Sequence, residues 1–394
     1  MRHLTLLILL AVLWACDTSS TTPLSESDYV PLSQDSLPAQ TFSKKGKLHN
    51  ALPLSAIYTP IALDTFQLPI VDGKVVTALQ RQRRLLHKKR QRFNRRVGDL
   101  RINLDDLTQT VDILESWQHL IPVGMEKELK AHQVWGKDHR GNVKFTAYFA
   151  PVIQVSKKPT AVYKYPIRAT PKGLRGQLPD RRAIEAGAID SITQHLAYAR
   201  SKTDIYYMQL QGSGYVEYAD GSRELFAYAG ENRHPYRSIE SYLATNSKQL
   251  GISNVSMQGV KRYLEKRPDL VDSVLNQNPS YTFFRRRQAP PTGAGHVPLT
   301  EGMSIAVDKK YIPLGSCLLA AVPILDEDDK VIGHEMKYLF AQDVGGAIKG
   351  SGRVDVYFGA GADAERKANS FNAYGRMWLL LPKQQPMPMI LASK

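Results

Sequence analysis

The sequence predicts a mainly β protein with some α-helix, organised as more than one folded unit. The chain has 394 residues, of which 43% are hydrophobic, and this length exceeds one average domain. After Lys144, short runs of β-branched and aromatic residues alternate with glycine and proline corners, which is typical of strands. Helical periodicity is concentrated ahead of them, from Val75 to Leu120.

The chain begins with a secretion signal. Met1 to Cys16 has a cationic start and an apolar run from Leu6 to Ala15, too short for a membrane-spanning helix of about 20 residues. The run ends in the form of a lipoprotein cleavage box, with Trp14 in place of the usual small or aliphatic residue. We therefore expect a lipid-modified Cys16 at the mature N-terminus. The alternative is an ordinary secretory signal, although the only other cysteine, Cys317, gives Cys16 no obvious disulfide role.

Both ends of the chain have low-complexity composition. Residues 17–47 are rich in Ser, Thr, Pro and Asp, and they predict a flexible tether that spans about 30 Å. A lipid-anchored protein could use such a tether to reach a polymer layer above the membrane. Gln384 to Met389 is broken by proline and predicts a loose tail.

The net charge of +15 is concentrated in one segment. Nine Lys and Arg residues and no acid fall between Arg81 and Arg96, which we expect to be helical. This segment is either a solvated helix face or a contact with anionic headgroups or cell-wall polymers. We expect no nucleic-acid partner, because the secretion signal directs the chain out of the cytosol.

The helices and strands follow from the spacing of apolar residues. Two front helices are predicted by two sets, Leu79, Leu85, Leu86 and Phe93, then Leu104, Leu107, Val111 and Leu114. Further helices are expected at 180–200, 238–246, 256–266 and 271–277. Strands are expected at 145–150, 162–165, 205–211 and 215–218, and then, spaced as in a small barrel, at 303–307, 317–322, 338–342, 353–358 and 377–381.

The most informative strand is Arg353 to Phe358. Its alternation places Arg353, Asp355 and Tyr357 on one face and apolar residues on the other. An acid between a cation and a phenol suits acid–base chemistry. From this segment alone, a structural Arg–Asp pair on an exposed sheet face is the favoured alternative.

The sequence lacks the residue patterns that several other kinds of catalytic or binding site require. The strand that ends at Asp343 leads into a glycine-rich turn without the Lys and Ser or Thr of a phosphate-binding loop, and residues 359–364 lack the acid that a dinucleotide site needs about 20 residues later. Residues 212–214 lack the spacing of a nucleophile elbow. His234 and His296 stand alone, so we expect no metal and no cofactor. Carboxylates, aromatic residues and glycines remain, as a carbohydrate cleft requires.

These residues match a known family. From about Gly141 to Leu381 the chain resembles the membrane-bound lytic murein transglycosylase A family. The most specific matching segments are 145–151 with Ile153-Gln154, 211–215, 228–230, 236–239, 277–280 and the segments around Asp343 and Asp355.

The resemblance implies a fold and a set of acids. Asp308, Asp343 and Asp355 look like the trio of the family's three-aspartate domain, with Asp355 as the catalytic acid and the other two in support. The implied fold is a double-psi β-barrel from residues 48–145 and 283–383, with a smaller β-barrel of residues 146–282 inserted and a glycan groove between them. Substrate contacts are expected from Thr146, Tyr148, Gln209, Gln211, Ser213, Tyr228, Lys349 and Tyr357.

The implied enzyme is a peptidoglycan lytic transglycosylase. It cleaves the β-1,4 bond between N-acetylmuramic acid and N-acetylglucosamine and forms 1,6-anhydromuramic ends with one general acid/base. Two other classes stay open: an inverting glycosidase that uses water and two aspartates, and a non-catalytic peptidoglycan-binding lipoprotein. The expected location is the periplasmic side of a bacterial membrane, with the outer membrane favoured over the inner.

Overall fold

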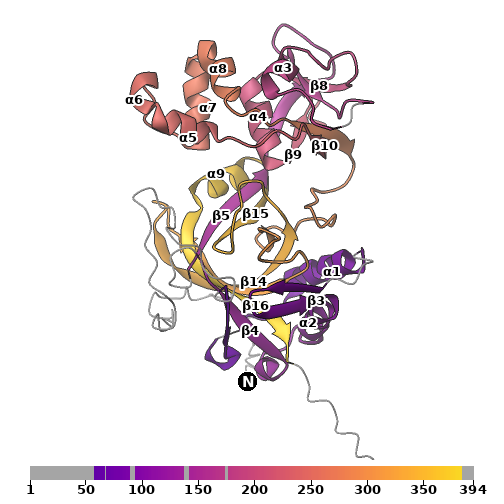
Figure 1. The fold of residues 1–394 in the computed structure, drawn as a ribbon, viewed down its shortest axis with the longest axis vertical. Helices are drawn as coiled ribbons and strands as arrows, with labels where there is room; N and C mark the ends of the chain where they lie inside the picture. The colour runs from indigo at the N-terminus through magenta and orange to yellow at the C-terminus, as the bar shows by residue number, and fades with distance from the viewer. Residues whose placement is uncertain (1–56, 67, 89–93, 137–141, 174–175, 384–394) are drawn as a thin grey trace, which may run out of the picture.

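The computed structural model describes residues 57–66, 68–88, 94–136, 142–173 and 176–383 (Figure 1). The expected signal peptide, Cys16, the tether at 17–47, the tail at 384–389 and Phe93 lie outside these residues. Within them, no helix combines the length and the apolar character that a membrane crossing needs.

Eight strands form the lower body in Figure 1, in the order β1-β4-β16-β13-β14-β12-β15-β5. An additional pairing of β16 with β5 closes six of them into a ring. Two pairs in the ring, β12 with β14 and β15 with β5, are parallel. The strands are β1 (Tyr58–Ile61), β4 (Leu129–Val134), β5 (Val143–Ala150), β12 (Ser304–Ala306), β13 (Cys317–Leu325), β14 (Val331–Asp343), β15 (Arg353–Ala360) and β16 (Asn372–Pro382).

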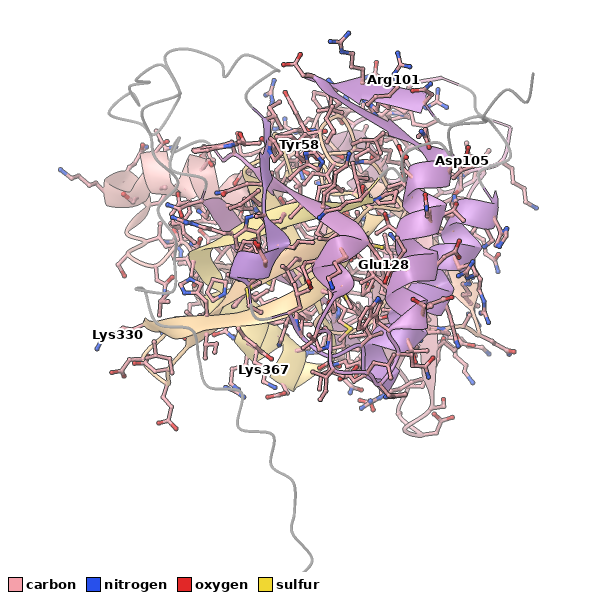
Figure 2. The ribbon with its side chains drawn as sticks, turned by 90° about the horizontal axis from the view of Figure 1, so that it is seen from below. Tyr58, Arg101, Asp105, Glu128, Lys330 and Lys367 are labelled. Atoms are coloured by element: carbon pink, nitrogen blue, oxygen red, sulfur yellow. The ribbon has the colours of Figure 1, made fainter. Side chains whose placement is uncertain are left out.

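Two helices, α1 (Gly73–Lys88) and α2 (Leu104–Ser116), pack on this ring. Their leucines join the apolar core of the ring, as the periodicity predicts. Asn103 and Asp106 form a capping box that fixes the start of α2. Seen from below in Figure 2, Asp105 marks the first turn of this helix.

The prediction of a basic helix from residue 81 to residue 96 is confirmed as far as Lys88 and is wrong from Asn94 onward. The end of this segment is β2 (Asn94–Val97), which pairs with β3 (Leu100–Asn103). The turn between them contains Gly98 with a φ of 63°, a conformation that suits glycine in a tight hairpin. The cations of the segment that the structure describes are therefore distributed over two elements, α1 and β2.

The upper body in Figure 1 contains a six-stranded sheet in the order β11-β10-β9-β6-β8-β7. An isolated bridge between Ala169 and Phe284 links its two edges. The strands are β6 (Val152–Ser156), β7 (Tyr165–Arg168), β8 (His195–Ala199), β9 (Ser213–Glu217), β10 (Arg223–Glu231) and β11 (Thr282–Arg287). The helices are α3 (Arg181–Glu185), α4 (Lys202–Gln211), α5 (Ile239–Thr245), α6 (Ser247–Leu250), α7 (Met257–Lys266) and α8 (Val271–Leu275).

Three predicted elements in this body are wrong. The expected strand at 205–211 is helix α4, whose N-cap Ser201 accepts from the Asp204 N–H and whose C-cap Gly212 has a φ of 77°. The expected helix at 180–200 ends at Glu185, and the later part is β8 because Gly187, with a φ of 93°, turns the chain. The strand expected at 162–165 begins only at Tyr165.

The two bodies touch through α9 (Ala362–Ser370). Ala364 and Ala368 of α9 pack with Phe149, and Met257 of α7 packs against this cluster. The Lys261 ammonium lies 3.0 Å from a carboxylate oxygen of Glu365 and 3.7 Å from one of Asp204. An apolar contact and a shared cation therefore join the two bodies at this point.

Candidate active site

Two of the three expected acids lie in one row across the ring. Ala306 of β12 pairs with Asp343 on one side and with Asp355 on the other. Asp355 also pairs with Thr146 of β5. Because neighbouring strands lie about 4.8 Å apart, the backbones of Asp343 and Asp355 are separated by roughly 10 Å.

Asp355 is a largely buried carboxyl beside a cation. Its side chain is 19% exposed, and its Oδ1 lies 3.7 Å from Nη2 of Arg353, which is too long for a hydrogen bond. This oxygen has no hydrogen-bond partner among the described residues. Burial raises the pKa of Asp355 to about 6, with a contribution from the charge of Asp343, although Arg353 opposes the rise. The carboxyl can therefore hold a proton close to neutral pH.

Asp343, in contrast, has both oxygens occupied. Its Oδ1 accepts from the backbone N–H groups of Ala294 and Val344, each at 2.8 Å, and its Oδ2 accepts from the Tyr148 hydroxyl at 2.9 Å. Burial raises the pKa of Asp343, while these three donors favour the carboxylate. Gly293 approaches so closely that a Cβ there would lie 2.8 Å from Cβ of Asp343. The surrounding backbone thus holds this side chain in one position.

Asp308 holds two turns together. Its Oδ1 accepts from the N–H of Lys310 at 3.0 Å, and its Oδ2 accepts from the N–H of Gly350 at 2.9 Å. Gly350 belongs to the turn between β14 and β15, so this acid fixes the loop that leads into the strand of Asp355. Its contacts are those of a positioning residue.

Three of the four expected substrate residues of the lower body lie close to Asp355. The Thr146 hydroxyl donates to the Val354 carbonyl at 3.2 Å, and the same hydroxyl oxygen accepts from Nη2 of Arg353. The rings of Tyr148 and Tyr357 lie 5.3 Å apart, and burial raises the pKa of both phenols. Lys349 is exposed in the turn next to Gly350. The structure thus brings Thr146, Tyr148 and Tyr357 close to the acid, whereas Lys349 lies in the turn that Asp308 holds.

The expected substrate residues of the upper body divide into two groups. Gln209 is buried in α4, where its amide oxygen accepts from Arg181 at 2.7 Å and its nitrogen donates to the Thr282 carbonyl at 3.2 Å, so it serves packing. Gln211 accepts from the Phe149 N–H at 3.2 Å, at the junction with the lower body. Ser213 is half-buried at the start of β9, and Tyr228 of β10 is 48% exposed.

Two tyrosines near the acid were not predicted. Burial raises the pKa of Tyr236 while the charge of Arg353 opposes the rise, and burial and the Tyr215 phenol both raise the pKa of Tyr357. These residues of the two bodies therefore lie within electrostatic range of each other. Both tyrosines lie in the segments 211–215 and 236–239 that carry the family resemblance. Each tyrosine is an aromatic residue inside a segment that resembles the family, and this was the signal that could have identified it as a site residue.

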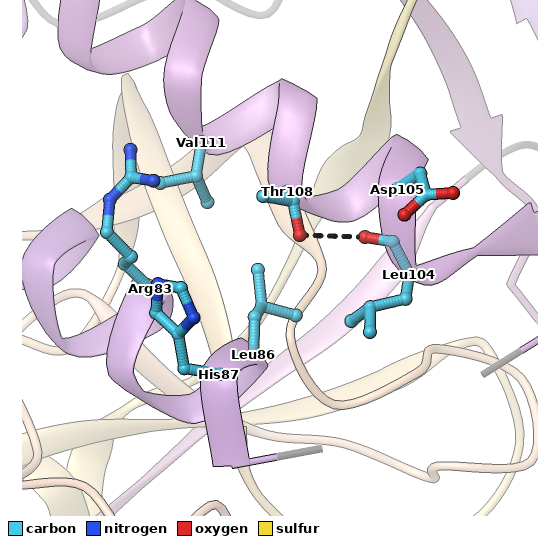
Figure 3. A pocket seen from close by; sticks show the side chains of 7 residues that line it. All are labelled: Arg83, Leu86, His87, Leu104, Asp105, Thr108 and Val111. Carbon is cyan, nitrogen blue, oxygen red and sulfur yellow. Dashed lines mark hydrogen bonds between the residues drawn. The ribbon is translucent and has the colours of Figure 1, made fainter. Parts of the chain in front are cut away.

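A pocket of about 250 Å³ lies elsewhere, between α1 and α2 (Figure 3). Arg83, Leu86, Leu104 and Thr108 are among its lining residues, and the Thr108 hydroxyl donates to the Leu104 carbonyl at 2.9 Å. None of the three acids lines it. This pocket belongs to the packing of two helices and is separate from the site around Asp355.

No group of three His, Cys, Asp or Glu side chains within the described ranges could hold a metal ion. Cys317 is a buried free thiol in β13, and burial raises its pKa. A ring nitrogen of His234 lies 2.8 Å from the Leu178 carbonyl oxygen, a structural contact.

Comparisons with known proteins agree with this arrangement. Residues 144–285 match the model of the MltA specific insert domain, and residues 303–381 match that of the 3D domain. Membrane-bound lytic murein transglycosylase A of Escherichia coli K12 is 43% identical over 257 residues, 64% of this chain and 69% of the relative. The protein of the same name from Vibrio cholerae is 36% identical over 262 residues, 66% of this chain and 70% of the relative.

Solved structures extend the similarity to the fold. E. coli MltA with bound chitohexaose has a TM-score of 0.69 and 34% identity, over 84% of this chain and 96% of that one. A membrane-bound lytic murein transglycosylase from Agrobacterium tumefaciens has a TM-score of 0.68 and 26% identity, over 82% of this chain and 97% of that one. The chain belongs to the membrane-bound lytic murein transglycosylase A family.

Proposed function

We propose that this protein is a lytic transglycosylase that cleaves the glycan strands of peptidoglycan, with Asp355 as its general acid and base. Its family relatives are named for murein, and one was solved with a bound chito-oligosaccharide. The observation that carries the assignment of the acid is the raised pKa of Asp355, about 6, at a largely buried carboxyl whose Oδ1 is not hydrogen-bonded to the described residues.

The reaction needs one carboxyl in two protonation states. Protonated Asp355 gives its proton to the glycosidic oxygen, the bond from this oxygen to muramic C1 breaks, and N-acetylglucosamine leaves with the new hydroxyl. The Asp355 carboxylate then accepts the proton of the muramic C6 hydroxyl as its oxygen bonds to C1. The 1,6-anhydro ring closes, the acid is regenerated and no water is consumed.

The inverting alternative would require Asp343 to activate a water molecule. Such a base accepts a proton from water through an oxygen lone pair, and three of the about four lone-pair sites of the Asp343 carboxylate already accept from Tyr148 and from two backbone N–H groups. We therefore assign Asp343 a supporting role, in which its negative charge raises the pKa of Asp355.

We also propose how the substrate is held. The closed six-stranded ring is compatible with a double-psi barrel from residues 48–145 and 283–383, with residues 146–282 as the inserted barrel. The glycan would run along the junction, where Tyr236 lies within electrostatic range of Arg353, and Tyr215 of Tyr357. Thr146, Tyr148, Gln211, Ser213, Tyr228, Lys349 and Tyr357 are the proposed contacts, whereas the buried Gln209 supports α4.

The location is part of the same proposal. Lipid modification at Cys16 would anchor the enzyme on the periplasmic side of a bacterial membrane, and we favour the outer membrane. The predicted tether at residues 17–47 would then span about 30 Å, which would let the active site reach the polymer layer.

The masses of the products test this function. Digestion of purified peptidoglycan with the full chain should give 1,6-anhydromuramic ends, which are about 18 mass units lighter than hydrolysed ends because no water is added. Products with reducing ends would place the enzyme among the hydrolases, and the absence of cleavage would leave a binding protein.

A further inference from the structure

Three exposed lysines gather around Asp308. Lys309 and Lys310 follow the strand β12, and Lys349 lies in the turn that precedes β15. The backbone nitrogens of Lys310 and Gly350 lie 3.0 and 2.9 Å from the two oxygens of the same Asp308 carboxylate. This double contact brings the two lysine-bearing turns side by side.

The cluster carries uncompensated positive charge. None of the three ammonium groups forms an ion pair with a residue in the described ranges, and the two Asp308 oxygens already accept from backbone N–H groups. Arg95 of β2 adds a fourth cation, since its Nη1 donates to the Lys309 carbonyl at 2.6 Å. Four cations and one occupied carboxylate therefore lie on this part of the surface.

The cluster also lies near the reacting acid. Ala306, which pairs with Asp355, is the last residue of β12, only three residues before Lys309. At about 3.3 Å per extended residue, Lys309 lies on the order of 10 Å along the chain from the row of acids. A side chain carried by the muramic sugar could span this distance while the glycan occupies the site.

We propose that Lys309, Lys310 and Lys349 bind the carboxylates of the peptide stems of peptidoglycan, an inference that rests on the proposed function. Each muramic acid can carry a short peptide on its lactyl group, and these peptides end in carboxylates. Ammonium groups without protein partners are complementary to them, and the fixed turns present these groups at one place. The stem then adds binding energy beside the glycan contacts.

An anionic membrane surface is the competing partner for such a patch. The position of the lysines favours the stem, because they follow the strand ends that carry the catalytic row. A membrane contact would place the entrance for the glycan against the bilayer.

The test compares two substrates in four proteins. The full chain, the Lys309→Gln/Lys310→Gln double variant, and a control with Lys248→Gln and Lys266→Gln are assayed on peptide-bearing strands and on the same strands stripped of peptides by an amidase. Lys248 and Lys266 are exposed lysines of α6 and α7 in the upper body. Adding Lys349→Gln to the double variant gives the fourth protein.

We expect the KM for peptide-bearing strands to rise about five- to tenfold in the double variant, and further with the third substitution, because several exposed ionic contacts are lost. The preference of the unaltered chain for peptide-bearing strands should shrink as salt is raised to about 0.5 M. The control should match the unaltered chain. Cleavage by the unaltered chain without any such preference would overturn this inference alone, whereas no cleavage of either substrate would overturn the proposed function.

Two further results would contradict the inference. Equal losses on both substrates in the double variant would mean that the lysines act on the glycan or on the fold. If the substrate preference were unchanged, and if the same substitutions in a Cys16→Ala full-length chain reduced co-sedimentation with phosphatidylglycerol vesicles, the patch would be a membrane contact.

Discussion

Asp355 and Arg353 lie on one face of β15 with 3.7 Å between Oδ1 and Nη2, yet the pKa of Asp355 is raised to about 6. Burial of the carboxyl therefore outweighs the neighbouring cation. The arrangement gives Arg353 a defined effect, because its charge keeps the pKa from rising further. The pair is both the structural contact that the sequence suggested and part of the acid–base site.

The first prediction concerns the pH profile. Because the general acid must be protonated, kcat/KM should fall as the pH rises through about 6, the pKa of Asp355. Arg353→Gln removes the charge that lowers this pKa, so the alkaline limb should move to higher pH. Arg353→Lys retains a cation and should leave the limb near its original position. An alkaline limb that moves to lower pH in the Gln variant would refute this role of Arg353.

The second prediction concerns Tyr148. Tyr148→Phe keeps the ring against Tyr357 but removes the donor to Asp343 Oδ2, which should cost about 1–3 kcal/mol of stability and raise the pKa of Asp343. A more neutral Asp343 no longer raises the pKa of Asp355, so the alkaline limb should move to lower pH. Thermal melting and kcat/KM profiles measure both effects. Tyr357→Phe is the control, and a limb shift in it of the same size would argue against a specific role for Tyr148.

The third prediction concerns Lys261, which lies between Asp204 and Glu365. The pKa of Asp204 is raised by burial and lowered by Lys261, so Lys261→Met should raise it further. A raised folded-state pKa costs stability as the carboxyl ionises, so the loss should be about 1–2 kcal/mol at pH 7.5 and smaller at pH 4.5. Thermal melting at both pH values tests it, with the exposed Lys266→Met as the control. A loss of the same size at both pH values would exclude the electrostatic cause.

The fourth prediction concerns the anchor. Cys16→Ala removes the expected site of lipid attachment, so the protein should leave the membrane fraction and appear in the soluble extract. Cell fractionation followed by immunodetection measures this distribution, and Cys317→Ala provides the matched substitution at the buried thiol. Unchanged membrane association of the Cys16→Ala chain would remove the lipoprotein proposal.

Much of the lower body could be predicted from the sequence. Its strands carry apolar residues at the expected spacing. The alternation from Arg353 to Phe358 correctly predicts a strand there, with Arg353 and Tyr357 on the same face as Asp355. The leucine sets of α1 and α2 were equally informative, because their stripes face the core of the ring. Elements whose packing repeats a simple period are the ones that a sequence reveals.

Elements without a clear period were predicted less well. The segment 205–211 has the aromatic composition of a strand, but it lies in helix α4, where residues 205–209 are all buried, so no polar face reveals the helical period. Its caps, Ser201 and Gly212, were the better signal. Gln209 was expected to contact substrate. Its contact with Arg181 depends on the helical conformation, which the local sequence did not indicate.

Long-range contacts of the site could not be predicted from local patterns. Tyr148 and Asp343 are 195 residues apart in the sequence, and their hydrogen bond depends on the closure of the ring. The three donors to Asp343 include the backbone of Ala294, a residue type with no chemical signal. The family resemblance identified the three acids, and the structure shows which groups each of them contacts.

Turnover of the Asp355→Asn and Asp343→Asn variants on peptidoglycan tests the central claim most directly. The amide at position 355 keeps the shape but can neither donate the proton nor take it back, so activity should fall at least a hundred- to ten-thousand-fold, with melting temperature and chito-oligosaccharide binding retained. The amide at position 343 can still accept from one or two of its donors, so part of the activity should remain. Near-normal turnover in Asp355→Asn, together with complete loss in Asp343→Asn, would contradict the assignment and exchange the two roles.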